Sequence, residues 1–112
     1  MPIVHELLPT DVTDDTSAVH DATALAAVLS VLGDPTRLAI LSHLRSGEHR
    51  VRDLVDHMGL AQSTVSVHLA CLRDAGLVTV RAEGRASWFS LRHPEGLQEL
   101  LRCADSLVEE AS

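Results

Sequence analysis

The residues best suited to chemistry in this chain lie in one short stretch, from Leu60 to Gly76. Its first turns hold small or hydrogen-bonding side chains, namely Gln62, Ser63, Thr64, Ser66, Val67 and His68. Such side chains are slim enough to enter the major groove of DNA and polar enough to bond base edges and phosphates. Val65, Leu69 and Leu72 recur at helical spacing, which would hold the opposite face on a core. The alternative is an ordinary amphipathic core helix with a polar outer face.

Two cysteines, Cys71 and Cys103, offer a second kind of chemistry. The N-terminal residues show no secretion signal, so we expect a cytoplasmic protein without a structural disulfide. The thiols would then be soft-metal ligands, partners in thiol oxidation, or inert half-buried side chains. Cys71 lies on the same expected helix as the hydrogen-bonding residues, so DNA reading and sensing would share one element.

The histidines mark no catalytic geometry. His43, His49 and His57 fall at scattered spacing and are expected on solvated outer faces, and the roles of His5 and His20 stay open. We find no nucleophile–base set, phosphate loop or paired acid motif, so we expect no enzyme.

The distribution of charge matters more than the net charge of −7. Residues 35–92 hold eight arginines against five acidic residues, a local charge of +3, whereas residues 1–34 and 93–112 are acidic. DNA binding needs a local positive face rather than a positive chain. All nine basic residues are arginine, which forms bidentate contacts with phosphate and guanine.

The chain divides into a flexible arm, residues 1–16, and one domain, residues 17–112. Apolar periodicity predicts helices over 17–32, 35–45, 51–58 and 94–110, and over the opening stretch as far as Gly76. Gly33 ends the first helix, and Asp34 and Pro35 are suited to begin the next. There is no apolar run near 18 residues, hence no expected membrane span.

After Gly76 the periodicity changes from helical to alternating. Strands are expected over 77–81 and 87–91, with a hairpin tip at 83–85. A helix-turn-helix followed by a hairpin is a winged helix, so the predicted fold class is mainly α with a β-hairpin wing. Arg81 and Arg85 would stand on the wing, within reach of phosphate or the minor groove.

The first and last helices both carry an apolar stripe, more apolar surface than one small core can cover. We therefore expect a homodimer through these two helices. A symmetric dimer would place two reading helices on a palindromic site.

These motifs, in this order, resemble the ArsR/SmtB family of bacterial metal-sensing repressors over roughly residues 20–110. The matching segments are LGDPTRLAIL at 32–41, QSTVSVHL at 62–69, LRDAGLV at 72–78 and EGR at 83–85. The resemblance implies a dimeric winged-helix repressor that leaves its operator when an inducer binds.

The resemblance also implies two kinds of inducer site. One joins the last helices of both protomers and maps to His93, Glu95, Ser106 and Glu109, of which Ser106 departs from the pattern. Such a donor set would suit zinc or a similar divalent ion. The other uses thiolates and maps to Cys71, but its second cysteine is Ala75 here. Cys71 would then need Cys103 or a residue of the arm as a partner.

Our hypothesis is a metal-responsive repressor that binds a palindromic operator as a dimer and is released by a divalent or soft metal ion, Zn²⁺ or Cd²⁺/Pb²⁺. The expected DNA contacts are Gln62, Ser63, Thr64, Ser66 and His68, with Arg50, Arg52, Arg73, Arg81 and Arg85 on phosphates. One alternative is a thiol-redox repressor that uses Cys71 and Cys103. Another is a winged-helix protein-interaction module, which predicts no salt-dependent binding to duplexes.

Overall fold

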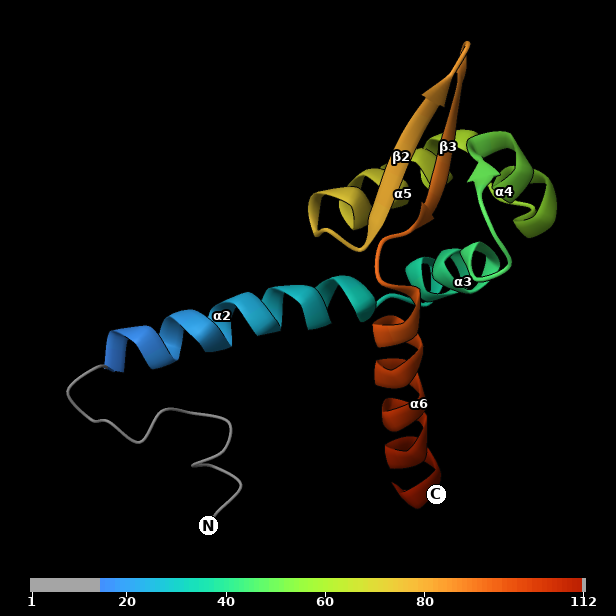
Figure 1. The fold of residues 1–112 in the computed structure, drawn as a ribbon. Helices are drawn as coiled ribbons and strands as arrows, with labels where there is room; N and C mark the ends of the chain where they lie inside the picture. The colour runs from blue at the N-terminus through green and yellow to red at the C-terminus, as the bar shows by residue number, and fades with distance from the viewer. Residues whose placement is uncertain (1–14, 112) are drawn as a thin grey trace.

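The structure, a computed structural model, describes residues 15–111 and confirms the fold class predicted from the sequence (Figure 1). Its elements are α2 (Asp15–Leu32), α3 (Pro35–Leu44), β1 (His49–Arg50), α4 (Val51–Met58), α5 (Gln62–Asp74), β2 (Val78–Glu83), β3 (Ala86–Leu91) and α6 (Pro94–Ala111). Helix α2 begins at Asp15, slightly before the expected start at Ser17. Residues 1–14 of the expected arm, His5 included, lie outside the described residues.

Helices α2 and α3 meet at a sharp corner made by residues 33 and 34. The Asp34 carboxylate accepts a hydrogen bond from the backbone N–H of Arg37 at 2.9 Å and so caps α3, whose first residue is Pro35. No single helix among residues 15–111 is long and apolar enough to span a membrane. Only Asp21–Leu32 and α3 together reach that length and composition, and they are bent by 83°.

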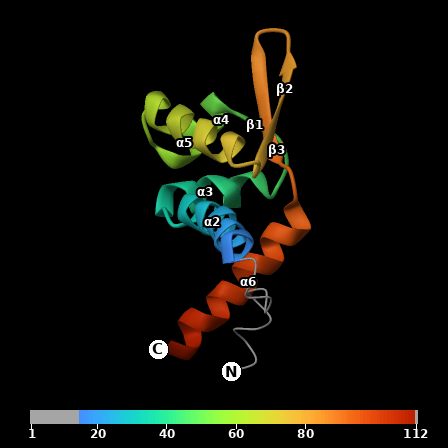
Figure 2. The ribbon, with the colours of Figure 1, turned by 90° about the vertical axis from the view of Figure 1, so that its left-hand side faces the viewer.

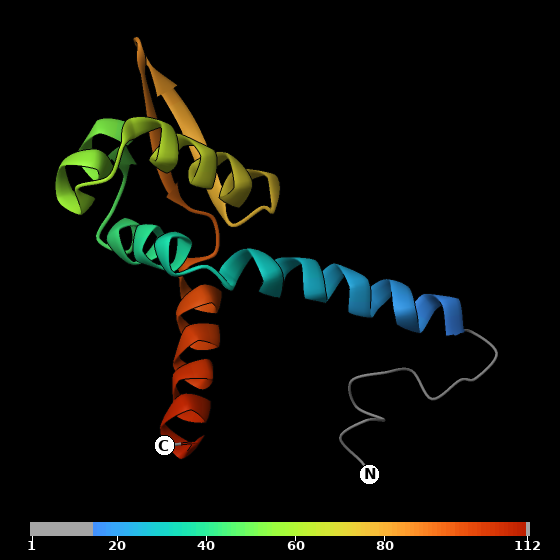
Figure 3. The same ribbon diagram turned by 180° about the vertical axis from the view of Figure 1, so that it is seen from behind.

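The helix-turn-helix consists of α4 and α5. Gly59 ends α4 with a φ of 68°, a left-handed conformation that favours glycine. Val65, Leu69 and Leu72 of α5 are fully or almost fully buried, as their spacing predicted. They hold α5 against α3, which lies beneath it, and against α4, which lies beside its start (Figure 3).

The wing is a hairpin with a third strand added. Strands β2 and β3 pair antiparallel from Val78↔Leu91 to Glu83↔Ala86, so the strands are longer than expected and the turn holds only two residues. Strand β1 pairs with β3, which gives the order β1-β3-β2. Strand β1 thus joins the middle of β3 to the start of α4.

Helices α2 and α6 leave the body in different directions (Figures 1 and 2). The radius of gyration is 17.0 Å, against about 13 Å for a compact chain of roughly 100 residues. Leu25 on α2 is 56% exposed and Leu107 on α6 is 68% exposed, whereas Leu97, near the start of α6, is buried. In a single chain the apolar stripes of both helices are therefore largely uncovered, as expected.

One core prediction was wrong. The spacing of Leu38, Leu41 and Leu44 predicts that all three face inward, but Leu38 is 36% exposed while the other two are buried. The buried residues Ile40, Leu41 and Leu44 define the inner face of α3. At about 100° per residue, Leu38 lies at the edge of that face rather than in it.

Candidate nucleic-acid interface

The outer face of α5 is centred on Val67 and carries small, uncharged side chains around it, with the exposed Asp74 at its C-terminal end. Each helical residue turns the side chain by about 100°, which places Ser63 and Val67 roughly opposite the buried stripe of Val65, Leu69 and Leu72. Val67 is 67% exposed, and Gln62, Ser63 and Thr64 at the N-terminal end are also exposed. Ser66 is half-buried on the flank. From the sequence, Val67 was expected among the small residues of this helix, with no predicted contact.

His68 lies away from this face, because its position on α5 is next to the buried stripe. Its Nδ1 atom is 3.4 Å from the Arg37 guanidinium and 4.0 Å from the Asp34 carboxylate. Hydrogen bonding by the backbone N–H of Arg37, reinforced by the charges of Arg37 and His68, holds the pKa of Asp34 below its usual range. The structure thus places His68 at the α2–α3 corner, where it connects that corner to the middle of α5.

Arg37 completes this connection from the other side. Its Nε atom donates to the backbone carbonyl of Val31 at 2.5 Å, and a second guanidinium nitrogen donates to that of Ser30 at 3.4 Å. These carbonyls belong to the last turn of α2, where cations are favourable. One guanidinium therefore joins the end of α2 to His68 on α5, a contact that the sequence analysis missed.

Two of the arginines that were expected on phosphates place their guanidinium groups over the ring of Trp88. The guanidinium of Arg50 lies 4.8 Å from the ring centroid and that of Arg81 lies 5.9 Å from it. Asp53 binds Arg50 through both carboxylate oxygens at 3.1 Å, and Glu48 binds Arg81 at 2.9 and 3.1 Å. These bonds lower the pKa of Asp53 to about 2 and also lower that of Glu48. Phosphate would have to compete with carboxylates for both arginines.

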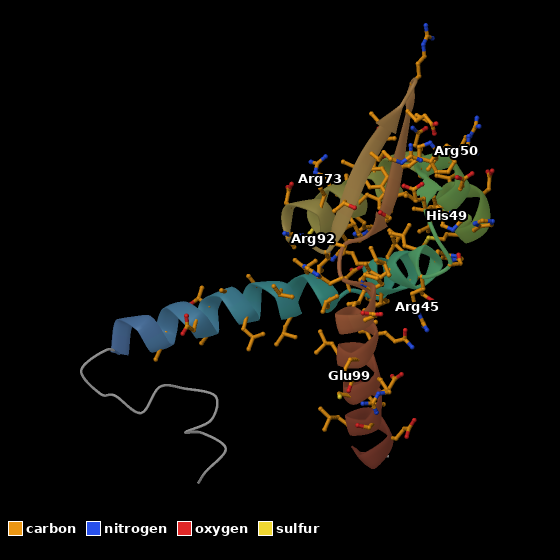
Figure 4. All side chains as sticks on the ribbon, in the orientation of Figure 1. Arg45, His49, Arg50, Arg73, Arg92 and Glu99 are labelled. Carbon is orange, nitrogen blue, oxygen red and sulfur yellow. The ribbon has the colours of Figure 1, made fainter. Side chains whose placement is uncertain are left out.

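Arg52 and Arg85 are less engaged with carboxylates than Arg50 and Arg81 are. Together with Arg50 they line an open hollow of about 420 Å³ between the start of α4 and the wing turn, completed by Val51, Ala86 and Ser87. In the described part of the chain neither Arg52 nor Arg85 is paired with a carboxylate. Arg73, on the opposite side of the hairpin from Arg50 (Figure 4), makes only a surface contact of 3.5 Å with Asp74. Arg52 and Arg85 are thus the arginines most available to phosphate.

Replacing Asp53 with asparagine is expected to lower the free energy of unfolding at neutral pH. The pKa of Asp53 is about 2 in the folded chain and 3.8 for a free carboxyl, so the folded state favours the ionised form. This stabilisation is complete above pH 3.8 and is lost as the pH falls toward 2. Urea unfolding of both proteins across this range measures it, with Asp56→Asn on the same helix as the control. A difference that stayed constant at low pH would contradict the expectation.

The candidate metal ligands are spread over one chain. His93 precedes α6, Glu95 lies in its first turn and Glu109 near its other end, all three exposed. Cys71 is half-buried on α5 and Cys103 is exposed on α6, where its thiol lies 3.7 Å from a Glu99 oxygen (Figure 4). Within the described residues no three His, Cys, Asp or Glu side chains are grouped so as to hold a metal ion. A site made from these ligands needs a second chain or residues outside the described range.

Three histidines expected at scattered positions lie together instead. The His57 ring stacks on that of His43 and meets that of His49 edge-on, both with centroids 5.7 Å apart. His43 and His49 are half-buried, so only His57 matches the expectation of a fully solvated ring. They come from α3, β1 and α4, so their proximity depends on the fold and was invisible in the spacing.

Comparison with known proteins agrees with this geometry. The family model described as bacterial regulatory protein, arsR family, matches residues 34–80, from the α2–α3 corner to β2. A probable mercury resistance operon repressor from Streptomyces lividans is 38% identical over 93 residues, which cover 81% of this chain and 74% of that protein. The chain belongs to the ArsR family. The resemblance stated from the sequence motifs is therefore confirmed.

Two further similarities describe this ArsR-family chain. The arsenical resistance operon repressor of Staphylococcus aureus is 41% identical over 69 residues, 62% of this chain and 66% of that protein. The solution structure of a homodimeric winged helix-turn-helix DNA-binding domain, Mb0332 from Mycobacterium bovis, superposes with a TM-score of 0.71 at 29% identity and covers 87% of each chain. The ArsR-family chain is thus a winged-helix transcription regulator.

Proposed function

We propose that the chain represses transcription in the cytoplasm by binding a palindromic operator as a homodimer, and that a divalent or soft metal ion releases it. The observation that carries the proposal is the uncovered apolar surface of α2 and α6 on a chain whose reading helix is fully formed. A single chain leaves Leu25 and Leu107 more than half exposed. Contact with a second copy would bury both stripes and pair the reading helices.

DNA binding by this dimer is supported by the arrangement around α5 and the wing. The slim outer face of α5 suits the major groove, and Gln62, Ser63 and Thr64 stand exposed at its N-terminal end. Arg52 at the start of α4 and Arg85 at the wing turn supply positive charge that no carboxylate of the described residues pairs with. Arg50 and Arg81 would contribute to the field while stacked on Trp88, and His68 would position α5 rather than read bases.

The metal response is supported by the chemistry of the donors and by the relatives. Two relatives are named as mercury and arsenical resistance operon repressors. His93, Glu95 and Glu109 offer an imidazole and two carboxylates, a set that suits zinc, and Cys71 and Cys103 offer thiolates for softer ions. The exposed donors of α6 would gather only where two chains meet, since the start and the end of one helix are far apart.

A gel-shift titration on the promoter of the chain's own gene tests the proposal. We expect an affinity that falls steeply with salt, and release by at least one of Zn²⁺, Cd²⁺, Pb²⁺, Hg²⁺ and arsenite. If binding depends on salt but no metal changes it, the proposed metal response is wrong and the proposed repressor function stands. Absence of salt-dependent binding to any duplex would overturn DNA binding and favour a protein-interaction module.

Replacing both His93 and Glu109 with alanine is expected to abolish release by Zn²⁺ and to leave DNA affinity without metal unchanged. Both side chains are exposed, so the fold should tolerate the change. The lost coupling free energy between Zn²⁺ binding and DNA binding would be about 1–3 kcal/mol. This corresponds to losing a decrease of about 5–150-fold in DNA affinity on adding Zn²⁺. Glu99→Ala is the matched control, because this carboxylate of the same helix is bound by Arg102. If the double variant still responds and Cys71→Ser or Cys103→Ser does not, the thiols hold the metal.

A further inference from the structure

Val67 occupies the point of α5 that would go deepest into the groove. It lies within roughly 20° of the direction opposite the buried stripe, as helical geometry places it. Ser63 precedes it by one turn and the half-buried Ala70 follows it, so its neighbours along this face are small. Most of its surface, 67%, is exposed in the described chain.

A valine at this point has a restricted chemistry. Its side chain neither donates nor accepts a hydrogen bond, so it cannot read the nitrogen and oxygen atoms of base edges. Placed against the amino group of cytosine or the acceptors of guanine, it would take water from those groups without replacing the bond. In the major groove of unmodified DNA, the C5-methyl group of thymine is the apolar feature it can contact favourably.

We propose that Val67 reads one thymine in each half-site of the operator by packing against its C5-methyl group. This inference rests on the proposed function, because it needs α5 in the major groove of a duplex. The hydrogen-bonding side chains at the N-terminal end of α5 fix its register, and Val67 adds the methyl contact. Specificity at that base pair then comes from apolar contact rather than from a bidentate hydrogen bond.

The test removes the methyl group alone. An operator is first selected from a pool of random duplexes with the full-length protein, and each thymine is then replaced in turn by deoxyuridine. Loss of one buried methyl corresponds to about a fourfold loss of affinity, and loss from both half-sites to about fifteenfold. Replacing the same thymine by 5-methylcytosine, with guanine opposite, keeps the methyl and should retain part of the affinity lost with unmethylated cytosine.

Variants of the protein assign the effect to Val67. In Val67→Ala the ratio of affinities for the thymine and deoxyuridine operators should fall to about one, whereas Val67→Thr, which keeps one methyl group, should retain part of it. Val80→Ala is the matched control, since Val80 is an exposed valine on the wing, and it should keep the wild-type ratio. All these positions lie on the surface, and circular dichroism checks that each variant is folded.

The outcomes separate this inference from the function on which it rests. A wild-type protein that binds the selected operator but tolerates deoxyuridine at every position would overturn the role of Val67 and leave the repressor intact. A thymine preference that Val67→Ala preserves would do the same. Failure to enrich any duplex would overturn operator binding itself, and the methyl contact with it.

Discussion

Leu107→Asp is expected to convert the protein to a monomer and to reduce its affinity for a palindromic operator. Leu107 is 68% exposed on α6, so the substitution should leave the fold of one chain unchanged. At a symmetric interface the change occurs twice, and each copy loses about 1.5–3 kcal/mol of leucine burial in addition to the cost of a desolvated carboxylate. The dimer dissociation constant should therefore rise by at least about 100-fold.

Sedimentation at several protein concentrations measures this change directly. Val80→Asp places the same charge on an exposed valine of the wing and should leave the dimer intact. Leu25→Asp, on α2, should weaken the dimer as Leu107→Asp does, because both helices are expected in one interface. A Leu107→Asp protein that stays dimeric would mean that the end of α6 lies outside the interface.

Arg37→Ala is expected to destabilise the protein and to loosen the connection between α2 and the reading helix. The variant loses two hydrogen bonds to carbonyls at the end of α2 and the contact with His68. Hydrogen bonds that involve a charged group contribute about 1.5–3 kcal/mol each. Because the bond to Ser30 is exposed and 3.4 Å long, we expect the loss of about one such bond. Operator affinity should fall as well, since the angle between α2, which is expected in the dimer interface, and α5 is less fixed.

Urea unfolding at a fixed protein concentration and a gel shift measure the two effects. Arg45→Ala is the matched control, because Arg45 follows the same helix and its side chain is exposed. Arg37→Lys keeps the charge but cannot bridge α2 and His68, so it should recover only part of the stability. Equal behaviour of Arg37→Ala and Arg45→Ala would show that the corner does not hold α5.

The sequence predicted the elements well where their ends carry local signals. Gly33, Asp34 and Pro35 fixed the corner between α2 and α3, and Gly59 fixed the end of α4, because capping depends on residues close in the chain. Alternating residues after Gly76 placed both strands of the wing. The predicted strand ends differ from the observed ones by up to two residues, since the pairing of Glu83 with Ala86 depends on the hairpin register rather than on composition.

The surroundings of single side chains were harder to predict, because they depend on residues distant in the sequence. The position of the His68 ring 4.0 Å from the Asp34 carboxylate, for example, joins residues 34 positions apart and was not predicted. Arg81 was expected to be free for phosphate, yet it binds Glu48 on the loop before β1. A helical projection of α5 would have shown Val67 opposite the core, so that signal was present. The prediction instead favoured polar residues as the ones that read DNA.

The arginines over the ring of Trp88 also make this residue an intrinsic fluorescence probe. Trp88 is the one tryptophan of the sequence, which contains no tyrosine, so indole emission reports on a single place. Two guanidiniums, those of Arg50 and Arg81, lie over this ring. An operator phosphate that drew either of them away would change the polarity around the indole and shift its fluorescence. Arrival of DNA at the wing can thus be followed in solution without any attached dye.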